Sequence, residues 1–249
     1  MPLKIKVFKE RDPAAAGGPE MLKVFQAMDA AGKDSTIRKV FSGVNPAGFR
    51  VHAFGRPSEL ELRHDFLARI GQRLPERGKI GIFNRSHYEE VLVVRVHQEL
   101  LGKQKLPSKL VTRRIWKERF EDISAFERHL LRSGTKVLKF HLRISKEEQK
   151  ERLIARLDDP SKRWKFSMGD VEERKLWDRY MDAYEDAIRS TSTPEAPWYV
   201  VPADKKWFAR LVIATAIVDT LEGLDLKFPK ADKAALQEMK QIRKALAAD

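Results

Sequence analysis

Residues 22–37, which read LKVFQAMDAAGKDSTI, contain the segment that decides the fold. The apolar run from Leu22 to Met28 has the composition of a buried β-strand, and the run from Ile37 to Phe41 has a helical pattern. Small residues and a Gly-Lys pair connect them. Small side chains let backbone N–H groups face an anion, and the N-terminus of the following helix adds a partial positive charge. The stretch therefore predicts a phosphate-binding loop that ends at Gly32 and Lys33.

Two positions depart from the strict phosphate-loop pattern G-x-x-x-x-G-K-[ST], because Ala27 stands at the first glycine and Asp34 follows the lysine. An ordinary strand-to-helix turn, with Lys33 in solvent, stays open as an alternative. Asp29 favours the phosphate-binding interpretation, since a carboxylate so close to bound phosphate calls for a Mg²⁺ ion between them. The other interpretation of Asp29 is a turn or capping residue.

Short β-type runs alternate with longer helical patterns along the rest of the chain. This alternation is typical of βαβ units around a parallel sheet. The pattern of residues 177–188 places Trp177, Tyr180, Met181, Tyr184 and Ile188 on one helical face, as expected for a helix that packs on a core. We predict one α/β domain. Its expected strands are Met21–Met28, Phe49–Phe54, Lys79–Phe83, Lys136–Leu142 and Trp198–Val201.

Composition excludes several classes of protein. With 42% hydrophobic and 34% charged residues, the 249-residue chain is neither collagen-like nor a low-complexity disordered protein. The formal net charge of +13 indicates a polyanionic partner. The absence of cysteine excludes disulfides and thiolate zinc sites and is expected in a reducing compartment. The sequence shows neither a signal-peptide pattern nor an apolar run of membrane-spanning length, so we expect a cytoplasmic protein with no membrane partner.

The two ends of the chain differ from the predicted domain. Pro13–Pro19, which reads PAAAGGP, cannot hold regular structure, so we expect residues 1–19 to be a flexible basic leader. The domain is expected over residues 20–229, and a C-terminal helix over residues 230–249. That helix has apolar side chains near one face, which could dock on the body or on another subunit: Leu236, Met239, Ile242 and Leu246.

Polar residues follow the predicted strand Lys79–Phe83 directly. In open α/β sheets ligands bind at the carboxyl ends of strands, which makes Asn84, Arg85 and Glu89 site candidates. Asn84 could bind a metal through its carbonyl or a water molecule, Arg85 offers a planar fork for phosphate oxygens, and Glu89 could ligate Mg²⁺ or contact an acceptor nucleotide. Alternatively, Asn84 and Ser86 are helix caps and Glu89 complements a helix dipole.

Two basic segments could contact a phosphate chain. A helix predicted over Ser108–Ser133 would place Lys109, Arg113 and Lys117 on one face, although such a run is often only solvated. The loop Asp159–Phe166 is basic and contains a proline, and Ser167 and Asp170 after it resemble a capping pair. Such a loop could close over phosphates and exclude water. Trp164 and Phe166 are expected to pack at a hinge rather than stack on a base.

Several motifs together resemble the family-2 polyphosphate kinases, P-loop proteins that transfer phosphoryl groups between inorganic polyphosphate and nucleotides. The resemblance covers roughly Lys23 to Pro229 and implies a P-loop kinase-like three-layer sandwich, with a five-stranded parallel sheet and a helical lid around residues 159–180. The motifs that carry it are Met28–Asp34 (MDAAGKD), Gly43–Gly48 (GVNPAG), His64–Leu67 (HDFL), Phe83–Glu89 (FNRSHYE), Trp164–Phe166 (WKF) and Trp177–Tyr180 (WDRY).

The resemblance also implies roles for individual residues. Asp29 would organise Mg²⁺ and phosphate, Lys33 is the phosphate-loop lysine, and Arg85 is the arginine after the second strand. With Asn84 and Glu89 these form the expected catalytic set, and Asp29 and Glu89 are the expected Mg²⁺ ligands. The expected phosphate- or polyphosphate-binding residues are Ala30, Ala31, Gly32, Asp34, Ser35, Arg113, Lys117, Lys162, Lys165 and Arg174.

The expected reaction is Mg²⁺-dependent, reversible phosphoryl transfer from polyphosphate to AMP and ADP, which yields ADP and ATP. Many members of the family have Asp at the position of Asn84 and Asn at that of Glu89, and the combination found here resembles the subgroup that accepts both monophosphates and diphosphates. We expect a homo-oligomer, a dimer or a tetramer, and no specific nucleic-acid partner. The alternatives are a nucleoside or nucleotide kinase that uses ATP as donor and a basic nucleic-acid-binding protein.

Overall fold

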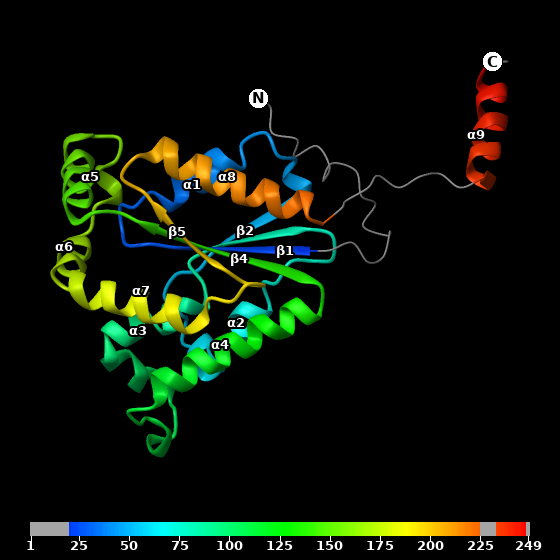
Figure 1. Ribbon diagram of the computed structural model, residues 1–249. Coiled ribbons are helices and arrows are strands. Elements are labelled where there is room, and N and C mark those ends of the chain that lie inside the picture. Colours follow the sequence, from blue (N-terminus) through cyan, green and yellow to red (C-terminus); the bar gives the residue numbers. More distant parts are fainter. Residues whose placement is uncertain (1–19, 225–232, 248–249) are drawn as a thin grey trace.

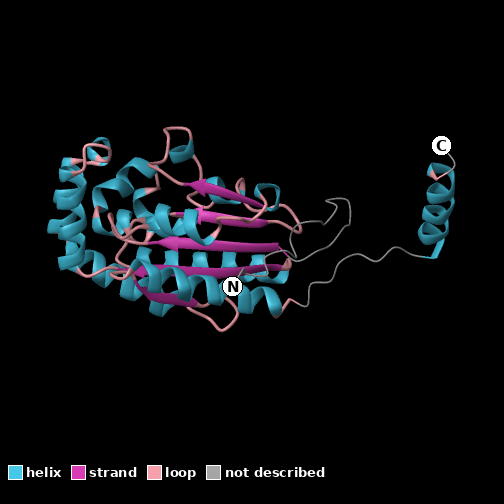
Figure 2. Ribbon diagram, turned by 90° about the horizontal axis from the view of Figure 1, so that it is seen from above, coloured by secondary structure: helices cyan, strands magenta, loops and turns pink. Residues whose placement is uncertain are grey.

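The computed structural model describes residues 20–224 and 233–247, in which a parallel sheet of five strands has the order β2-β3-β1-β4-β5 (Figure 1). The strands run side by side in one direction (Figure 2). All seven residues of the central strand are buried, including its three polar residues Glu20, Lys23 and Gln26. The strands are β1 (Glu20–Gln26), β2 (Phe49–Ala53), β3 (Ile80–Asn84), β4 (Thr135–Arg143) and β5 (Trp198–Pro202).

Helices cover both faces of the sheet. Helices α1 and α8 pack together on one face, whereas α4 and α7 lie on the other with the short helices α2 and α3 (Figure 1). Helices α5 and α6 lie beyond the carboxyl ends of the strands. The α-helices are α1 (Lys33–Val40), α2 (Ala68–Gly71), α3 (Val93–Val96), α4 (Ile115–Arg132), α5 (Lys146–Asp158), α6 (Met168–Lys175), α7 (Trp177–Thr191), α8 (Lys206–Glu222) and α9 (Lys233–Leu246). The 3-10 helices are η2 (Pro46–Gly48), η3 (Glu61–Arg63), η4 (His87–Glu90), η5 (Gln98–Gln104), η6 (Ser108–Leu110) and η7 (Arg163–Lys165).

This architecture confirms the predicted fold class, a P-loop kinase-like three-layer α/β sandwich. Each of the five expected strands is present, with bounds that differ by one or two residues. The apolar stripe of residues 177–188 lies in α7, where Trp177, Tyr180 and Tyr184 are buried in the core. None of the helices in the described ranges is both long and apolar enough to cross a membrane.

The helix predicted over Ser108–Ser133 is wrong in its first part, because α4 begins only at Ile115. The chain leaves helical geometry at Val111, whose φ and ψ are −82° and 78°, and the hydroxyl of Thr112 accepts a hydrogen bond from the Arg114 N–H (3.1 Å). Such a turn competes with the helix for the same backbone donors. Lys109 and Arg113 therefore precede α4 and share no helical face with Lys117.

The predictions for the two ends fall partly outside the described residues. The leader over residues 1–19 lies wholly outside them, as do residues 230–232, 248 and 249 of the predicted C-terminal helix. Helix α9 (Lys233–Leu246) lies in the remaining part of that range. The four apolar side chains of its stripe are exposed.

A buried polar cluster connects η4 to the core. The Tyr88 hydroxyl donates to Glu127 Oε1 (2.9 Å), and Lys139 donates to the Glu127 carboxylate and to the Thr191 carbonyl. Thr191 also accepts from Trp198 Nε1 (3.0 Å). The cluster joins β4, β5, α4 and α7 to the short helix that follows β3. Since its polar groups satisfy one another in the core, the cluster holds η4 in one position.

Lys23 is a buried cation in the central strand. Its side chain is fully buried, its Nζ has no hydrogen-bond partner among the described residues, and it lies 5.0 Å from the centroid of the Phe41 ring. Burial lowers the pKa of Lys23 to about 7. An unfolded chain binds the proton up to about pH 10. The buried lysine therefore destabilises the fold at neutral pH.

We expect Lys23→Met to raise the free energy of unfolding at pH 7 by about 2–4 kcal/mol. Between about pH 7 and pH 10 the unfolded wild type binds more protons than the folded one, so wild-type stability rises with pH and the advantage of the variant shrinks. Urea denaturation at pH 7 and pH 9.5 measures both effects. Lys136→Met, at an exposed position of β4, is the control and is expected to change stability by less than about 0.5 kcal/mol. An advantage of Lys23→Met that is equal at both pH values would contradict the prediction.

Candidate active site

The loop between β1 and α1 is a tight turn that leads into the N-terminus of α1. Ala30 and Gly32 both lie in the left-handed region, with φ values of 62° and 95°. Gly32 is the N-cap of α1, and a Cβ atom there would lie 3.3 Å from Ser35 Oγ. A non-glycine residue at positive φ costs free energy and persists only where its surroundings enforce it. The loop therefore presents a fixed backbone at the N-terminus of α1, which favours negative charge.

Lys33 is the first residue of α1, and its side chain is only 9% exposed. Its Nζ donates to the Ala27 carbonyl (2.8 Å), so the side chain lies along the loop rather than in solvent. Burial and the charge of Arg85 lower the pKa of Lys33, and the charges of Asp29 and Glu89 oppose this shift. The structure thus contradicts the alternative in which Lys33 is a solvated residue of an ordinary turn.

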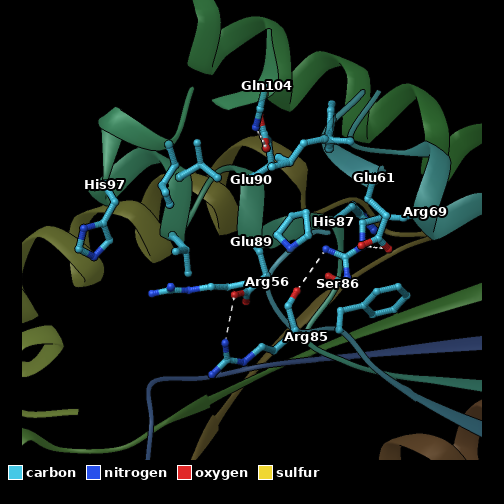
Figure 3. Close-up of a pocket in the computed structure, with 18 of the residues that line it drawn as sticks. Arg56, Glu61, Arg69, Arg85, Ser86, His87, Glu89, Glu90, His97 and Gln104 are labelled. Carbon is cyan, nitrogen blue, oxygen red and sulfur yellow. Dashed lines mark hydrogen bonds and ion pairs between the residues drawn. The ribbon is translucent and has the colours of Figure 1, made fainter. Parts of the chain in front are cut away.

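Arg85 lies between two carboxylates at the end of β3. Its Nη2 is 3.0 Å from Asp29 Oδ1. Its Nη1 is 3.6 Å from Glu89 Oε2, and Figure 3 shows this pair. The backbone is left-handed here, with φ of 65°, and the Arg85 N–H donates to the Phe25 carbonyl (3.0 Å). This bond continues the pairing of β3 with β1. The end of β3 is thereby fixed beside the start of the phosphate-binding loop.

Glu89 lies on η4 and completes this group. Burial raises the pKa of Glu89, whereas the cations Arg85 and Lys33 lower it. With its amide oriented to satisfy both neighbours, Gln26 donates to Glu89 Oε1 (2.9 Å) and accepts from the Ser86 N–H (3.0 Å). The last residue of β1 therefore orients the carboxylate that follows β3. Sequence patterns alone did not indicate this role, because Gln26 lies within the apolar run from Leu22 to Met28.

The remaining candidates near the loop bind one another. Asn84 Nδ2 donates to Asp34 Oδ1 (2.5 Å), which connects the end of β3 to the first turn of α1, and Ser35 Oγ donates to the Gly32 carbonyl (3.0 Å). Asn84 caps no helix. Ser86 does, since its hydroxyl accepts from the Tyr88 N–H (3.2 Å) at the start of η4. For Ser86 the capping interpretation is confirmed.

Basic residues of the predicted lid are already bonded within the protein. Lys162 pairs with Asp159, and Arg174 donates to the Lys146 carbonyl (2.5 Å) and to Gln149 Oε1 (2.9 Å). The side chain of Lys165 lies outside the described part of the structure. Arg174 therefore fixes the lid segment against α5.

The predicted capping pair after the lid loop is confirmed. Ser167 caps α6, with its hydroxyl accepting from the Gly169 N–H (3.1 Å), and the Asp170 carboxylate in turn accepts a hydrogen bond from the Ser167 backbone. The same carboxylate also accepts from Arg156 Nη1 (3.0 Å).

Arg113 and Lys117 are not brought to the loop. Neither lines the cavity beside it, and Lys117 is 74% exposed and lies 3.9 Å from Glu121. The cation of this segment that points inward is Arg119, which is 12% exposed and donates to Glu90 Oε1 (3.1 Å). Because α4 begins at Ile115, residue 119 lies on the face of the helix that packs against the protein and residue 117 lies on the face toward solvent.

A cavity of about 570 Å³ opens beside Asp29, Arg85 and Glu89 (Figure 3). Its volume is in the range of small-molecule sites. Two ion pairs stacked on aromatic rings form the distal wall. Arg69 pairs with Glu61 over Phe54, and this pair is partly exposed. Glu90 of the lining forms a buried pair with Arg119, which stacks on Phe66 but does not itself line the cavity. Other residues of the lining that the sequence did not indicate are Arg56, His97, Lys103, Gln104, Glu173, Tyr180 and Tyr184.

The loop between β1 and α1 thus lies beside a cavity that Asp29, Arg85 and Glu89 line. The family described as Polyphosphate kinase 2 (PPK2) matches residues 2–229. The chain belongs to the polyphosphate kinase 2 family. The AMP/ADP-polyphosphate phosphotransferase of Meiothermus ruber is 53% identical over 89% of this chain and 79% of that protein. The ADP-polyphosphate phosphotransferase of Rhodopseudomonas palustris is 49% identical over 91% of this chain and 78% of that protein.

A solved structure agrees with this assignment. Polyphosphate kinase 2 from Arthrobacter aurescens TC1 superposes with a TM-score of 0.87 and is 41% identical, covering 96% of this chain and 82% of that chain. As a member of the polyphosphate kinase 2 family, the chain is a phosphotransferase.

Proposed function

We propose that this polyphosphate kinase 2 transfers the terminal phosphoryl group of inorganic polyphosphate to AMP and ADP, and that the reaction is reversible and depends on Mg²⁺. The observation that carries the proposal is the convergence of Asp29, Lys33, Arg85 and Glu89 where a phosphate-binding loop meets the cavity. The names of the relatives from Meiothermus ruber and Rhodopseudomonas palustris support polyphosphate as donor.

The donor and acceptor occupy different parts of this site. The loop over residues 29–35 and the N-terminus of α1 bind the terminal phosphate of polyphosphate, with Lys33 neutralising its charge. The cavity holds the acceptor nucleotide, and Arg85 binds its terminal phosphate between Asp29 and Glu89. The net charge of +13 raises the local concentration of the polyanion.

The donor set fits Mg²⁺. Asp29 and Glu89 are carboxylates that share one guanidinium and face the cavity, and Mg²⁺ is usually bound by one or two carboxylates together with substrate phosphates. When bound, the ion neutralises charge that develops on the transferring group. Glu89 must be ionised for this, and the Gln26 amide at 2.9 Å supports that state.

Transfer itself requires little covalent chemistry from the protein. A terminal phosphate oxygen of the nucleotide attacks the terminal phosphorus of polyphosphate. The bond from that phosphorus to the bridging oxygen breaks, and the polyphosphate leaves as an anion that is one unit shorter. Lys33 and Arg85 hold the reacting groups in line and compensate their charge, which is the contribution expected of preorganised cations.

The absence of cysteine supports a reducing compartment, and we place the reaction in the cytoplasm. A homo-oligomer stays a prediction. The exposed stripe Leu236, Met239, Ile242 and Leu246 of α9 is a surface that could take part in it.

The test compares donors in one assay. The purified chain is incubated with Mg²⁺ and either polyphosphate or ATP as donor, with AMP or ADP as acceptor, and the nucleotides are separated by anion-exchange chromatography. We expect ADP from AMP and ATP from ADP with polyphosphate. AMP phosphorylation from ATP at a rate at least tenfold above that from polyphosphate would identify an ATP-dependent kinase instead. A control with EDTA tests the requirement for the metal ion.

A further inference from the structure

Arg152, in the middle of α5, uses all five of its N–H donors within the protein. Its side chain is 10% exposed, and Nε donates to Glu148 Oε1 (2.8 Å). The four remaining donors bind backbone carbonyls of two loops that are distant in sequence. Nη1 donates to Ala30 O (3.2 Å) and Ala31 O (3.0 Å), and Nη2 donates to Ala203 O (2.7 Å) and Asp204 O (2.9 Å). Because an arginine has only five N–H groups, none is left for a substrate.

These bonds determine how the phosphate-binding loop presents its N–H groups. In a trans peptide the C=O and the following N–H point in opposite directions. The Ala30 and Ala31 carbonyls point to Arg152, so the N–H groups of Ala31 and Gly32 point away from it. The Ala31 N–H closes a turn on the Met28 carbonyl (3.3 Å). The Gly32 N–H is then directed to the face of the loop opposite α5.

The same bonds support strained backbone. Ala30 has a φ of 62°, a conformation that alanine rarely adopts, and the adjacent carbonyls are held by a rigid planar fork. Gln149, one turn earlier on α5, donates from Nε2 to the Asp29 carbonyl (3.0 Å). One helix face thus binds three consecutive carbonyls, those of Asp29, Ala30 and Ala31.

The residues of α5 that bind the loop, Gln149 and Arg152, belong to a helix that also contacts the lid. Arg174 of α6 donates to the Gln149 side chain and to the Lys146 carbonyl, and Arg156 of α5 binds the Asp170 carboxylate of α6. Gln149 therefore touches both the loop and a lid residue. A displacement of α5 would move the phosphate-binding loop and the lid together.

We propose that Arg152 is a positioning residue for phosphoryl transfer, which holds the backbone of residues 29–32 in its anion-binding conformation without touching either substrate. The proposal rests on the function proposed above for the site. It differs from the usual interpretation of a basic residue near such a loop, in which the cation itself would bind polyphosphate.

The test compares Arg152→Lys, Arg152→Gln and the wild type. Lysine keeps the charge, but its three donors on a flexible chain cannot bind four carbonyls in two loops. We expect Arg152→Lys to lower kcat about thirtyfold, with KM for polyphosphate changed less than threefold. We expect both variants to keep the wild-type slope of log kcat/KM against log salt concentration. A residue that binds polyphosphate would instead reduce that slope by about one when its charge is removed.

Amide hydrogen exchange in the substrate-free protein gives a readout that does not depend on activity. We expect Arg152→Lys to speed exchange selectively in peptides covering residues 29–35. The control is Leu153→Ala, a buried neighbour on α5, which lowers stability but is expected to leave kcat and loop exchange unchanged well below its unfolding temperature. Because exchange needs no substrate, a failure of the proposed reaction is distinguishable from a failure of this inference.

If Arg152→Lys keeps the wild-type kcat and the wild-type exchange of residues 29–35, the proposal is overturned. A reduced slope of log kcat/KM against log salt concentration in Arg152→Gln would also overturn it. If the Arg152 variants do not fold, the variant Gln149→Met tests the proposal in their place. It removes one of the α5 donors to the loop and keeps the length of the side chain. We then expect a smaller loss of kcat, about fivefold, with faster exchange of residues 29–35. Unchanged exchange of these residues would refute the proposal that α5 holds the loop.

Discussion

Replacing Lys33 by methionine is expected to lower kcat about a thousandfold with polyphosphate as donor, with a much smaller change in KM for the nucleotide. The Lys33 ammonium is preorganised at the loop, where Nζ donates to the Ala27 carbonyl (2.8 Å), and it is buried beside the cavity. Removing one preorganised charge that acts on a transition state typically costs two to three orders of magnitude in rate. Nucleotide binding in the cavity does not depend on this side chain, because Lys33 is not part of the cavity lining.

The fold is expected to survive this substitution, which makes the result interpretable. Burial lowers the pKa of Lys33, so the charged ammonium carries a desolvation cost that methionine avoids. The lost hydrogen bond to Ala27 offsets part of that gain, and the free energy of unfolding should stay within about 2 kcal/mol of the wild type. Steady-state kinetics together with urea denaturation measure both quantities. Lys39→Met, at an exposed position of the same helix, is the matched control. A Lys33→Met protein that keeps more than a tenth of wild-type kcat would refute this role.

The central part of the site was predictable because it is local in sequence. The strand, the small residues and the Gly-Lys pair lie within residues 22–37, and the structure places them as expected, with Gly32 as the N-cap of α1. Arg85 was predicted from a general rule, that ligands bind at the carboxyl ends of the strands of an open α/β sheet, and Asp29 from its place beside the predicted phosphate-binding loop. The pairing of Phe25 with Asn84 shows how the rule operates here, because it places Arg85 next to the loop after β1.

The distal wall of the cavity could not be predicted from such rules. Arg69 and Glu61 belong to a segment with little regular structure, and Gln104 and Glu90 meet only because α3 and η5 fold back on η4. No periodicity marks these residues, and each is charged or amidic, which by composition alone indicates a surface. Their arrangement comes from tertiary packing, in which Arg69 stacks on Phe54 and Arg119, the partner of Glu90, stacks on Phe66.

Arg152 and Lys117 show why a basic residue cannot be assigned from charge alone. Both lie on helices with several cations, yet Arg152 is buried and binds four carbonyls whereas Lys117 is exposed. The difference depends on the phase of each helix, which is set by where it begins. The start of α4 was misplaced by seven residues, because the turn at Val111 and Thr112 carries no glycine or proline. An error of that size changes which side chains face the body.

We expect Asp29→Asn to lower kcat about three hundredfold and to raise the Mg²⁺ concentration required for half-maximal activity at least tenfold. Asparagine has nearly the same volume as aspartate and can still accept a hydrogen bond from Arg85 Nη2, which lies 3.0 Å from Asp29 Oδ1. The substitution therefore removes a charge while it preserves the shape of the site. A neutral amide is a much weaker ligand for Mg²⁺ than a carboxylate, so the loss should fall on the metal-dependent step.

Titration of activity with Mg²⁺ at saturating polyphosphate and AMP separates this effect from a loss of phosphate binding. Asp219→Asn, on the exposed side of α8, is the control and should match the wild type.

Glu89→Gln is expected to shift the Mg²⁺ requirement in the same direction. The double variant should lose less activity than the product of the two single effects, because both carboxylates serve one ion. An unchanged Mg²⁺ requirement in Asp29→Asn would mean that Asp29 acts only through its ion pair with Arg85. In that case Arg85→Lys, which keeps the charge but loses the planar fork, should reproduce the whole of the Asp29→Asn defect.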